Sequence, residues 1–365
     1  MKVVFLGDVM PGGVLPYIDS FPIDKDVMAI LSDSDLRIAT LECAIGDNLA
    51  FDPEKMSGRG NIIYSPTDSA DLICKMNLNV VSLANNHIFD LGLEGLESTL
   101  AFLRKNNILF TGAGRNISEA TKPVIIEKGD VKIAIIAACS YDYSQVAYVP
   151  IASENGYGVA SLDEKRICSQ ISELKRECDY VVVLPHWGIE YSYYPLKESV
   201  KLAKKMINSG ADLIVGSHTH LRQPAVTYKD KSIFFSLGNG LFPDFFVNAP
   251  RPIWYPDKTK VDVWKIPCTR DYPFPVLSPL RRVWKTESRI GLILTSEINK
   301  QSIKNKYKLL FLTEDNYLTL LNRRFIGLKL YLLGKFSLSP FYDEGNLIKF
   351  VKRGLRKIKR MILNK

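Results

Sequence analysis

Short apolar runs recur along most of the chain. They are rich in valine, isoleucine and leucine and are bounded by glycine, asparagine or proline. Continuous apolar runs of this length are typical of strands that are buried on both faces of a sheet. We predict strands at residues 2–8, 36–42, 79–87, 132–140, 180–188, 212–220 and 290–298.

Between these runs, apolar residues recur at the spacing of an amphipathic helix. In one such segment, Leu93, Leu96, Leu100 and Leu103 fall on a single helical face. The alternation of strands and helices predicts an α/β protein with right-handed crossovers. Helices are predicted at residues 66–77, 92–107, 163–177 and 196–209.

The pattern changes after Asn239. Residues 243–285 are rich in proline, tryptophan and tyrosine without periodicity, which predicts an irregular insertion or lid within a domain spanning 1–300. Residues 301–365 are expected to form a C-terminal extension. Its last part, 346–365, combines lysine and arginine with apolar residues near helical spacing and contains no acid, which predicts a basic amphipathic helix.

Apart from the position of the positive charge along the chain, the amino-acid composition adds little to these predictions. The net charge is +9, and much of the excess lies in residues 346–365. Such a helix suits peripheral contact with an anionic membrane, and packing against the body of the protein is the alternative. No recognised nucleic-acid motif accompanies it, so no specific nucleic acid is predicted as a partner.

The chain is expected to be cytoplasmic, with the inner face of the membrane as a peripheral location. Its first residues, MKVVFLGDVM, contain neither a long apolar region nor a cleavage site. No apolar run reaches the roughly 20 residues that span a bilayer. The six cysteines show no CxxC spacing and are expected to be reduced thiols.

Polar residues with metal-ligand chemistry end the predicted strands. In open α/β sheets the functional crevice lies outside the carboxyl ends of the strands. Imidazole and carboxylate groups together suit one or two divalent ions, most simply Mn, Fe or Zn. The residues in these places, which include all four histidines of the chain, are Asp8, Glu42, Asn86, His87, His186, His218 and His220.

His218 and His220 form the sharpest local signal. If the segment is extended, these alternate residues point the same way and approach one site together. Asp90, one turn after His87, is expected to hold the His87 ring in one tautomer. Each position also has a structural alternative, because Asp8 and Asp90 occur as caps, Glu42 occurs as a surface carboxylate, and a buried histidine is often a hydrogen-bonded core residue.

Six motifs in this order resemble the bacterial capsule synthesis protein CapA family, within the calcineurin-like metallophosphatase superfamily. The resemblance covers roughly residues 1–298 and is supported by a further segment, GAGRNxxEA (112–120). It implies a metallophosphoesterase-like four-layer sandwich, with two mixed β-sheets flanked by helices. The motifs are GDVM (7–10), LE (41–42), LANNHxxDxG (83–92), HWGxEY (186–191), GSHTH (216–220) and SLGN (236–239).

The resemblance also implies roles. Asp8 and His220 are expected to bind a first metal, with Glu42 bridging to a second. Asn86, His186 and His218 are expected to bind that second metal. His87, supported by Asp90, is implied as the general acid.

Other residues are implied around the metals. Glu190, Asn239 and Arg222 are expected to contact substrate or support the ligands, although a solvated surface residue is the alternative for Arg222. The wider superfamily usually has DxH in its first motif, and here the third position is Met10. The residue after Glu42, Cys43, is expected to be a small buried one.

The resemblance implies a metal-dependent hydrolase of the phosphoesterase type in capsule, poly-γ-glutamate or related exopolymer biosynthesis. Its expected partner is an anionic substrate or polymer. Two alternatives stay open. One is a non-catalytic, metal-containing component of a polymer synthesis or export complex at the membrane, and the other is a general phosphodiesterase or nucleotidase.

Overall fold

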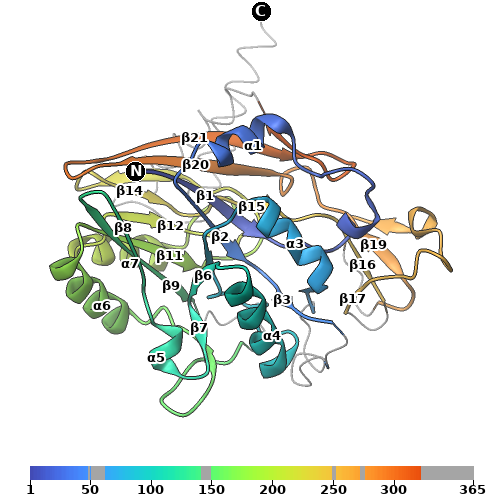
Figure 1. The fold of residues 1–365 in the computed structure, drawn as a ribbon, viewed down its shortest axis with the longest axis horizontal. Coiled ribbons are helices and arrows are strands. Elements are labelled where there is room, and N and C mark those ends of the chain that lie inside the picture. Colours follow the sequence, from blue (N-terminus) through green and yellow to red (C-terminus); the bar gives the residue numbers. More distant parts are fainter. Residues whose placement is uncertain (48–49, 51–61, 141–148, 249–251, 272–275, 322–365) are drawn as a thin grey trace, which may run out of the picture.

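The computed structural model describes residues 1–47, 50, 62–140, 149–248, 252–271 and 276–321. Two large sheets dominate it (Figure 1). The first has the strand order β22-β21-β20-β1-β2-β5-β6, and β15 pairs with the carboxyl-terminal end of β1. Its strands are β1 Lys2–Val9, β2 Leu36–Leu41, β5 Val80–Ser82, β6 Leu109–Thr111, β15 Asn239–Leu241, β20 Ile290–Ile298, β21 Ile303–Leu312 and β22 Leu318–Leu321.

The second sheet has the order β13-β14-β12-β11-β9-β8. Its four central strands run parallel, and β8 and β13 are antiparallel strands at its two edges. Both large sheets are therefore mixed, as predicted. The strands are β8 Val124–Lys128, β9 Val131–Cys139, β11 Tyr180–His186, β12 Leu213–Val215, β13 Ala225–Tyr228 and β14 Lys231–Phe234.

Helices cover the outer faces of the two sheets, which gives four layers (Figure 1). Helices α6 and α7 pack on the second sheet, and α1, α3 and α4 pack on the first. Aspartates begin two of them: Asp24 caps α1 and Asp163 caps α6 by accepting backbone N–H groups. The helices are α1 Lys25–Ser32, α3 Thr67–Lys75, α4 Gly92–Lys105, α5 Ile117–Ala120, α6 Glu164–Glu177 and α7 Lys197–Asn208, with short 3-10 turns at η1 Leu15–Tyr17 and η2 Val263–Lys265.

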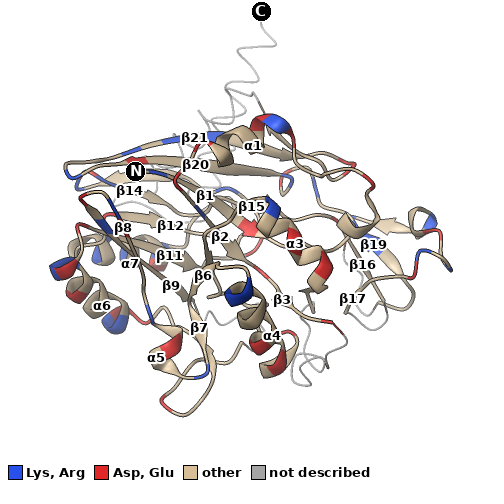
Figure 2. Ribbon diagram, in the orientation of Figure 1, with Lys and Arg blue, Asp and Glu red and all other residues tan. Residues whose placement is uncertain are grey.

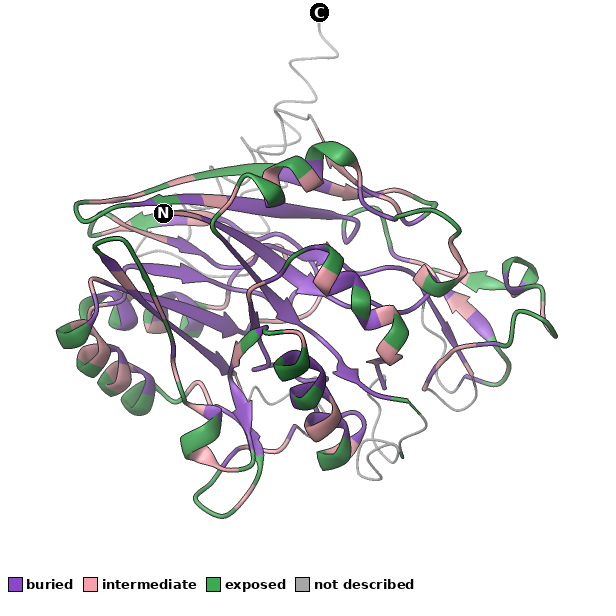
Figure 3. Ribbon diagram, in the orientation of Figure 1, coloured by how far each residue is buried: buried purple, intermediate pink, exposed green. Residues whose placement is uncertain are grey.

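The core lies on both faces of the second sheet, because successive side chains of a strand point to opposite faces. In β9, Ile133 and Ile135 join the cluster between the two sheets, whereas Ala134 and Ile136 pack in the cluster beneath α6 and α7. Figure 3 shows these central strands buried, with the exposed residues on the outward sides of the helices. The charged residues follow the same division and lie mostly on helices and loops (Figure 2). The continuous apolar runs of the sequence are thus explained by burial on two sides.

Two of the expected boundaries are wrong. Residues 303–321 are not separate from the domain, because β21 pairs along its whole length with β20 and β22 pairs with β21. Residues 243–285 are not irregular throughout, because they form a small third sheet in the order β17-β16-β19-β18. Its strands are β16 Phe245–Val247, β17 Ile253–Trp254, β18 Cys268–Thr269 and β19 Leu280–Arg282, and two further strand pairs join β3 Ala44–Ile45 to β4 Tyr64–Ser65 and β7 Ala113–Gly114 to β10 Gly158–Val159.

The predicted basic helix at 346–365 lies outside the described residues. Within the described part of the chain, none of the helices has the length and apolar character needed to cross a membrane.

Gly7 allows two motifs of the sequence to meet. The Asp8 N–H donates to the carbonyl oxygen of Gly238, at 3.1 Å, so the GDVM and SLGN segments lie against each other. A Cβ atom at Gly7 would come 1.7 Å from that oxygen. We expect Gly7→Ala to destabilise the protein by more than about 3 kcal/mol, because backbone atoms on both sides have to move.

Gly129 provides the matched control for Gly7. It has no atom near its would-be Cβ, and only its φ of +63° opposes a side chain. Gly129→Ala is expected to cost about 1 kcal/mol. Equal losses in urea unfolding for both variants would contradict the assigned close approach.

Candidate metal centre

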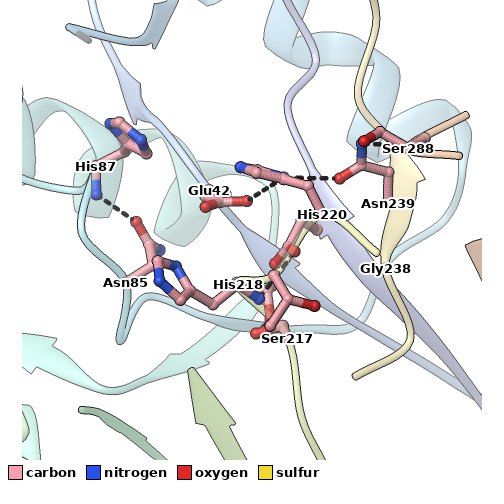
Figure 4. A network of polar contacts seen from close by, with 12 residues as sticks. Glu42, Asn85, His87, Ser217, His218, His220, Gly238, Asn239 and Ser288 are labelled. Atoms are coloured by element: carbon pink, nitrogen blue, oxygen red, sulfur yellow. Dashed lines mark hydrogen bonds and ion pairs between the residues drawn. The ribbon is translucent and has the colours of Figure 1, made fainter. Parts of the chain in front are cut away.

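The polar strand ends of the two large sheets converge on one buried site (Figure 4). Asp8 is the last residue but one of the strand β1, and Glu42 follows β2 directly. His186 ends β11, while His218 and His220 follow β12. All five residues are at most 3% exposed, so ligand-type side chains from both sheets are gathered in the interior of the protein.

Glu42, His186 and His218 form the first group that could hold a metal ion, with their ligand atoms within 4.8 Å of one another. His186 Nε2 lies 3.0 Å from His218 Nδ1 and 3.5 Å from Glu42 Oε1. The side-chain oxygen of Asn86 lies 2.8 Å from the same His186 nitrogen. Three residue types with lone pairs thus point at one small volume, which is the arrangement of a divalent-ion site.

Asp8, Glu42 and His220 form a second such group, by the same 4.8 Å criterion. Glu42 belongs to both groups, and its Oε2 lies 3.9 Å from His220 Nδ1. A carboxylate shared in this way is the feature that allows two ions to lie side by side.

The hydrogen bonding of the carboxylates fits a cation. Asp8 Oδ1 and both carboxylate oxygens of Glu42 are fully buried and accept no hydrogen bond from the described donors. Buried polar atoms are nearly always hydrogen-bonded, since leaving one unpaired costs about 1–3 kcal/mol. Three such oxygens beside three imidazoles are explained if a positive ion occupies the space between them.

The histidine loop differs from the expected extended segment. His218 and His220 have left-handed backbone conformations, with φ of 93° and 50°. They consequently separate: His218 joins the group with His186, and His220 joins the group with Asp8. The Asp8 carboxylate accepts the backbone N–H of His218 at 3.0 Å and fixes this turn. Strained backbone of this kind is common where a site requires exact side-chain placement.

Burial shifts the pKa values of the site in opposite directions. It raises the pKa of Asp8 to about 7 and that of Glu42 well above its usual range. At Glu42, repulsion from the neighbouring Asp8 carboxylate raises the pKa further. Burial also lowers the pKa of His218 to about 4 and of His220 to about 3, and that of His186 well below its usual range. A neutral carboxyl and neutral imidazoles are therefore favoured until a cation compensates the charge.

His87 and Asp90 lie beside the ligand groups. His87 Nδ1 is 2.7 Å from Asp90 Oδ2, and that oxygen also accepts the backbone N–H of Ile63 at 2.6 Å. Asp90 therefore fixes the orientation of the His87 ring. His87 belongs to neither ligand group.

The residues expected around the ligands divide into two kinds. Asn239 Oδ1 lies 2.9 Å from His220 Nδ1, so Asn239 orients the His220 ring. Glu190 is half-buried, and its charge contributes to the raised pKa of both Asp8 and Glu42.

Arg222 is neither a surface residue nor a described contact of the centre. It is 5% exposed, and its guanidinium donates to the carbonyl oxygens of Glu287 and Ile290, each at 3.3 Å. The alternative of a solvated surface arginine is wrong, because these carbonyl oxygens at and just before the start of β20 replace water. Its role is to bind the loop before that strand.

Met10 and Cys43 are both fully buried. A Cβ atom on Gly12 would meet the Met10 sulfur at 3.0 Å, and one on Gly13 would meet its methyl carbon at 3.2 Å. The Met10 side chain thus packs against the following backbone in the apolar core and belongs to neither ligand group. Cys43 is the small buried residue that was predicted.

Several supporting residues were missed. Ser217 lies 2.9 Å from His186 Nδ1, and Asn85 bridges the backbone of His87 and Leu41. Both stand within the GSHTH and LANNH motifs, so their position beside the ligands was a usable signal. Trp284 packs against His220 with ring centres 5.0 Å apart, and no sequence signal pointed to it.

Comparison with known families agrees with this geometry. A family described as bacterial capsule synthesis protein PGA_cap matches residues 2–244, which include every residue of both ligand groups. The chain belongs to the PGA_cap family. It is 38% identical over 176 residues to the PGA biosynthesis protein CapA of Bacillus subtilis and 33% identical over 181 residues to the capsule biosynthesis protein CapA of Bacillus anthracis.

These matches are partial. The aligned regions cover 48% of this chain in both cases, and 45% and 43% of the two relatives, so the chain spans less than half the length of these PGA_cap relatives. Among solved structures, a phosphatase of Mycoplasma pneumoniae aligns with 95% of this chain at a TM-score of 0.45 and 14% identity. A hypothetical protein of Thermus thermophilus aligns with 85% at the same score and identity.

Proposed function

We propose that the chain is a metal-dependent hydrolase of the phosphoesterase type that acts in capsule, poly-γ-glutamate or related exopolymer biosynthesis. The observation that carries the proposal is the carboxylate of Glu42, which is shared by two ligand groups and has no described hydrogen-bond donor on either oxygen. Membership of the PGA_cap family supports the biological setting.

The ligands are divided between two ions in this proposal. Glu42, Asn86, His186 and His218 would hold one ion, and Asp8, Glu42 and His220 would hold the other. The mixture of imidazole and carboxylate suits Mn, Fe or Zn. When bound, such an ion supplies Lewis acidity and positive charge to the reacting phosphoryl group.

The surrounding residues fix which nitrogen of each imidazole is available. Asn239 accepts the Nδ1–H of His220, and Ser217 contacts Nδ1 of His186, so Nε2 of each ring keeps its lone pair for a ligand bond. Neighbours that set the tautomer of a ligating histidine are general in metal sites. The imidazoles of His186, His218 and His220 are neutral near pH 7, because burial lowers their pKa values.

His87 is the proton donor to the leaving group in this proposal. Asp90 accepts from Nδ1 and leaves Nε2 for the substrate. We expect His87→Ala to lower kcat by roughly 100- to 1000-fold, the usual contribution of general acid catalysis. The measurement is hydrolysis of bis-p-nitrophenyl phosphate by the Mn-loaded protein.

Metal content is the control for this experiment. Because His87 is outside both ligand groups, His87→Ala is expected to bind as much manganese as the wild type. Asp90→Asn keeps the His87 ring but weakens the contact that orients it. This variant is expected to lose less activity than His87→Ala. Equal rates for wild type and His87→Ala, with metal bound to both, would remove His87 from the reaction.

A second candidate function is a non-catalytic component of a polymer synthesis or export complex, and Met10 is the observation that favours it. Because Met10 packs into the apolar core, the group around Asp8 has three residues rather than four. In that case the protein binds metal and an anionic polymer without turnover. Peripheral membrane contact through residues 346–365 belongs to this proposal, and sedimentation of the truncated chain with anionic vesicles tests it.

A further inference from the structure

Two aromatic rings stand beside His220 and lead from the buried centre to the surface. The Trp284 and Tyr191 ring centres lie 5.0 Å and 5.8 Å from that of His220. Trp284 and His220 are each 3% exposed, whereas Tyr191 is 46% exposed. Tyr191 thus marks the solvent side of the group formed by Asp8, Glu42 and His220.

Arg282 places a permanent positive charge beside the rings of Trp284 and Tyr191. It is the last residue of β19, and its guanidinium carbon lies 4.5 Å from the centre of the Trp284 ring. Its Nη2 donates to the Tyr191 hydroxyl at 3.3 Å.

The burial of Arg282 is informative. The residue is 6% exposed, so its contacts with Tyr191 and Trp284 hold the guanidinium largely out of water. A guanidinium presents its N–H donors as a planar fork that matches the oxygens of a phosphate or a carboxylate. The aromatic contacts hold the fork in place, so little freedom is lost when an anion binds.

We propose that Arg282, held by Trp284 and Tyr191, binds an anionic oxygen of the substrate beside the group formed by Asp8, Glu42 and His220. The inference rests on the proposed function and names its substrate class, an oxyanion. That oxyanion comes either from a phosphate ester or from the pendant carboxylates of an anionic polymer. The PGA_cap match ends at residue 244, so Arg282 and Trp284 lie on a part of the chain beyond it.

The neighbouring arginine provides a matched control. Arg281 precedes Arg282 on the same strand, and its guanidinium carbon lies 5.2 Å from the ring centre of Trp264, a half-exposed residue away from the metal ligands. Successive residues of a strand point to opposite faces. Removing Arg281 therefore removes the same charge from the same strand without changing the contacts of Trp284 and Tyr191 beside His220.

The test is calorimetric titration of the Mn-loaded full-length chain with inorganic phosphate and, separately, with a γ-linked glutamate decapeptide. We expect Arg282→Met to raise the Kd of at least one probe by roughly 10- to 100-fold, the loss expected when a charge-assisted hydrogen bond is removed. Arg281→Met is expected to change either Kd by less than threefold. The affected probe identifies the source of the oxyanion.

The outcomes separate this inference from the proposed function, because binding is measured without turnover. If the wild type shows no turnover but binds a probe, and only Arg282→Met weakens that binding, the result supports the inference. Unchanged affinity in Arg282→Met, equal effects of both variants, or no binding of either probe to the wild type overturns it. If Arg282→Met does not fold, Arg282→Lys decides: the loss of the planar fork should weaken binding about 3- to 10-fold, and wild-type affinity would refute the assignment.

Discussion

Replacing Glu42 with glutamine is expected to abolish the proposed metal-dependent turnover while leaving the metal-free protein folded. Glutamine has nearly the same shape as glutamate and carries no charge. Both carboxylate oxygens of Glu42 are buried without a described hydrogen-bond donor, and Glu42 is common to the two ligand groups. One substitution should therefore weaken both ion sites.

The stability of the variant is the more discriminating measurement. Burial and the neighbouring Asp8 raise the pKa of Glu42, so the ionised carboxylate opposes folding when no cation is present. Metal-free Glu42→Gln is expected to be at least as stable as the metal-free wild type at pH 8. Manganese at 100 times its Kd should stabilise the wild type by about 2.7 kcal/mol, and the variant by much less.

Glu190→Gln is the matched control for this substitution. Glu190 contributes to the electrostatics of Asp8 and Glu42 but belongs to neither ligand group. It should keep its metal-induced stabilisation. If Glu42→Gln binds and is stabilised by manganese like the wild type, the shared carboxylate does not hold an ion.

The layers and most of the site could be predicted from the sequence because one physical rule governs both. Strands buried on two faces appear as continuous apolar runs, and the polar residue after each run lies at the carboxyl edge of the sheet. That rule places Asp8, Glu42, His186 and the histidine pair at one end of two packed sheets. The structure brings these residues together.

The remaining features depend on contacts between distant segments, which local patterns do not encode. The third sheet has strands of two or three residues, too short for a periodic signal. Arg282 and Trp284 therefore looked like part of an irregular insertion. Arg222 looked solvated because its partners are carbonyl groups more than 60 residues further along the chain. The left-handed backbone of His218 is likewise accompanied by a hydrogen bond from its N–H to Asp8, which comes from another sheet.

Metal affinity is expected to fall steeply as the pH drops below about 7. In the metal-free protein, burial raises the pKa of Asp8 from 3.8 to about 7 and raises that of Glu42 well above its usual value. A folded-state pKa above the unfolded one stabilises the metal-free fold fully below the unfolded pKa. This contribution is lost as the pH rises through the folded pKa. Ion binding requires the deprotonated carboxylates and thus has the opposite pH dependence.

The histidines do not account for this effect, since burial lowers the pKa of His218 to about 4 and of His220 to about 3. They stay neutral in the folded protein between pH 5.5 and 8. At exposed histidine ligands, by contrast, protons would compete with the metal near pH 6.5. Manganese binding at pH 6.5 should therefore release protons from these carboxyls, measured by calorimetry in buffers of different ionisation enthalpy. The Tm increase with manganese should be large at pH 8 and small at pH 5.5. Affinity independent of pH, with no proton release, would mean that Asp8 and Glu42 are ionised before the metal arrives, and burial would then not be the dominant influence on this centre.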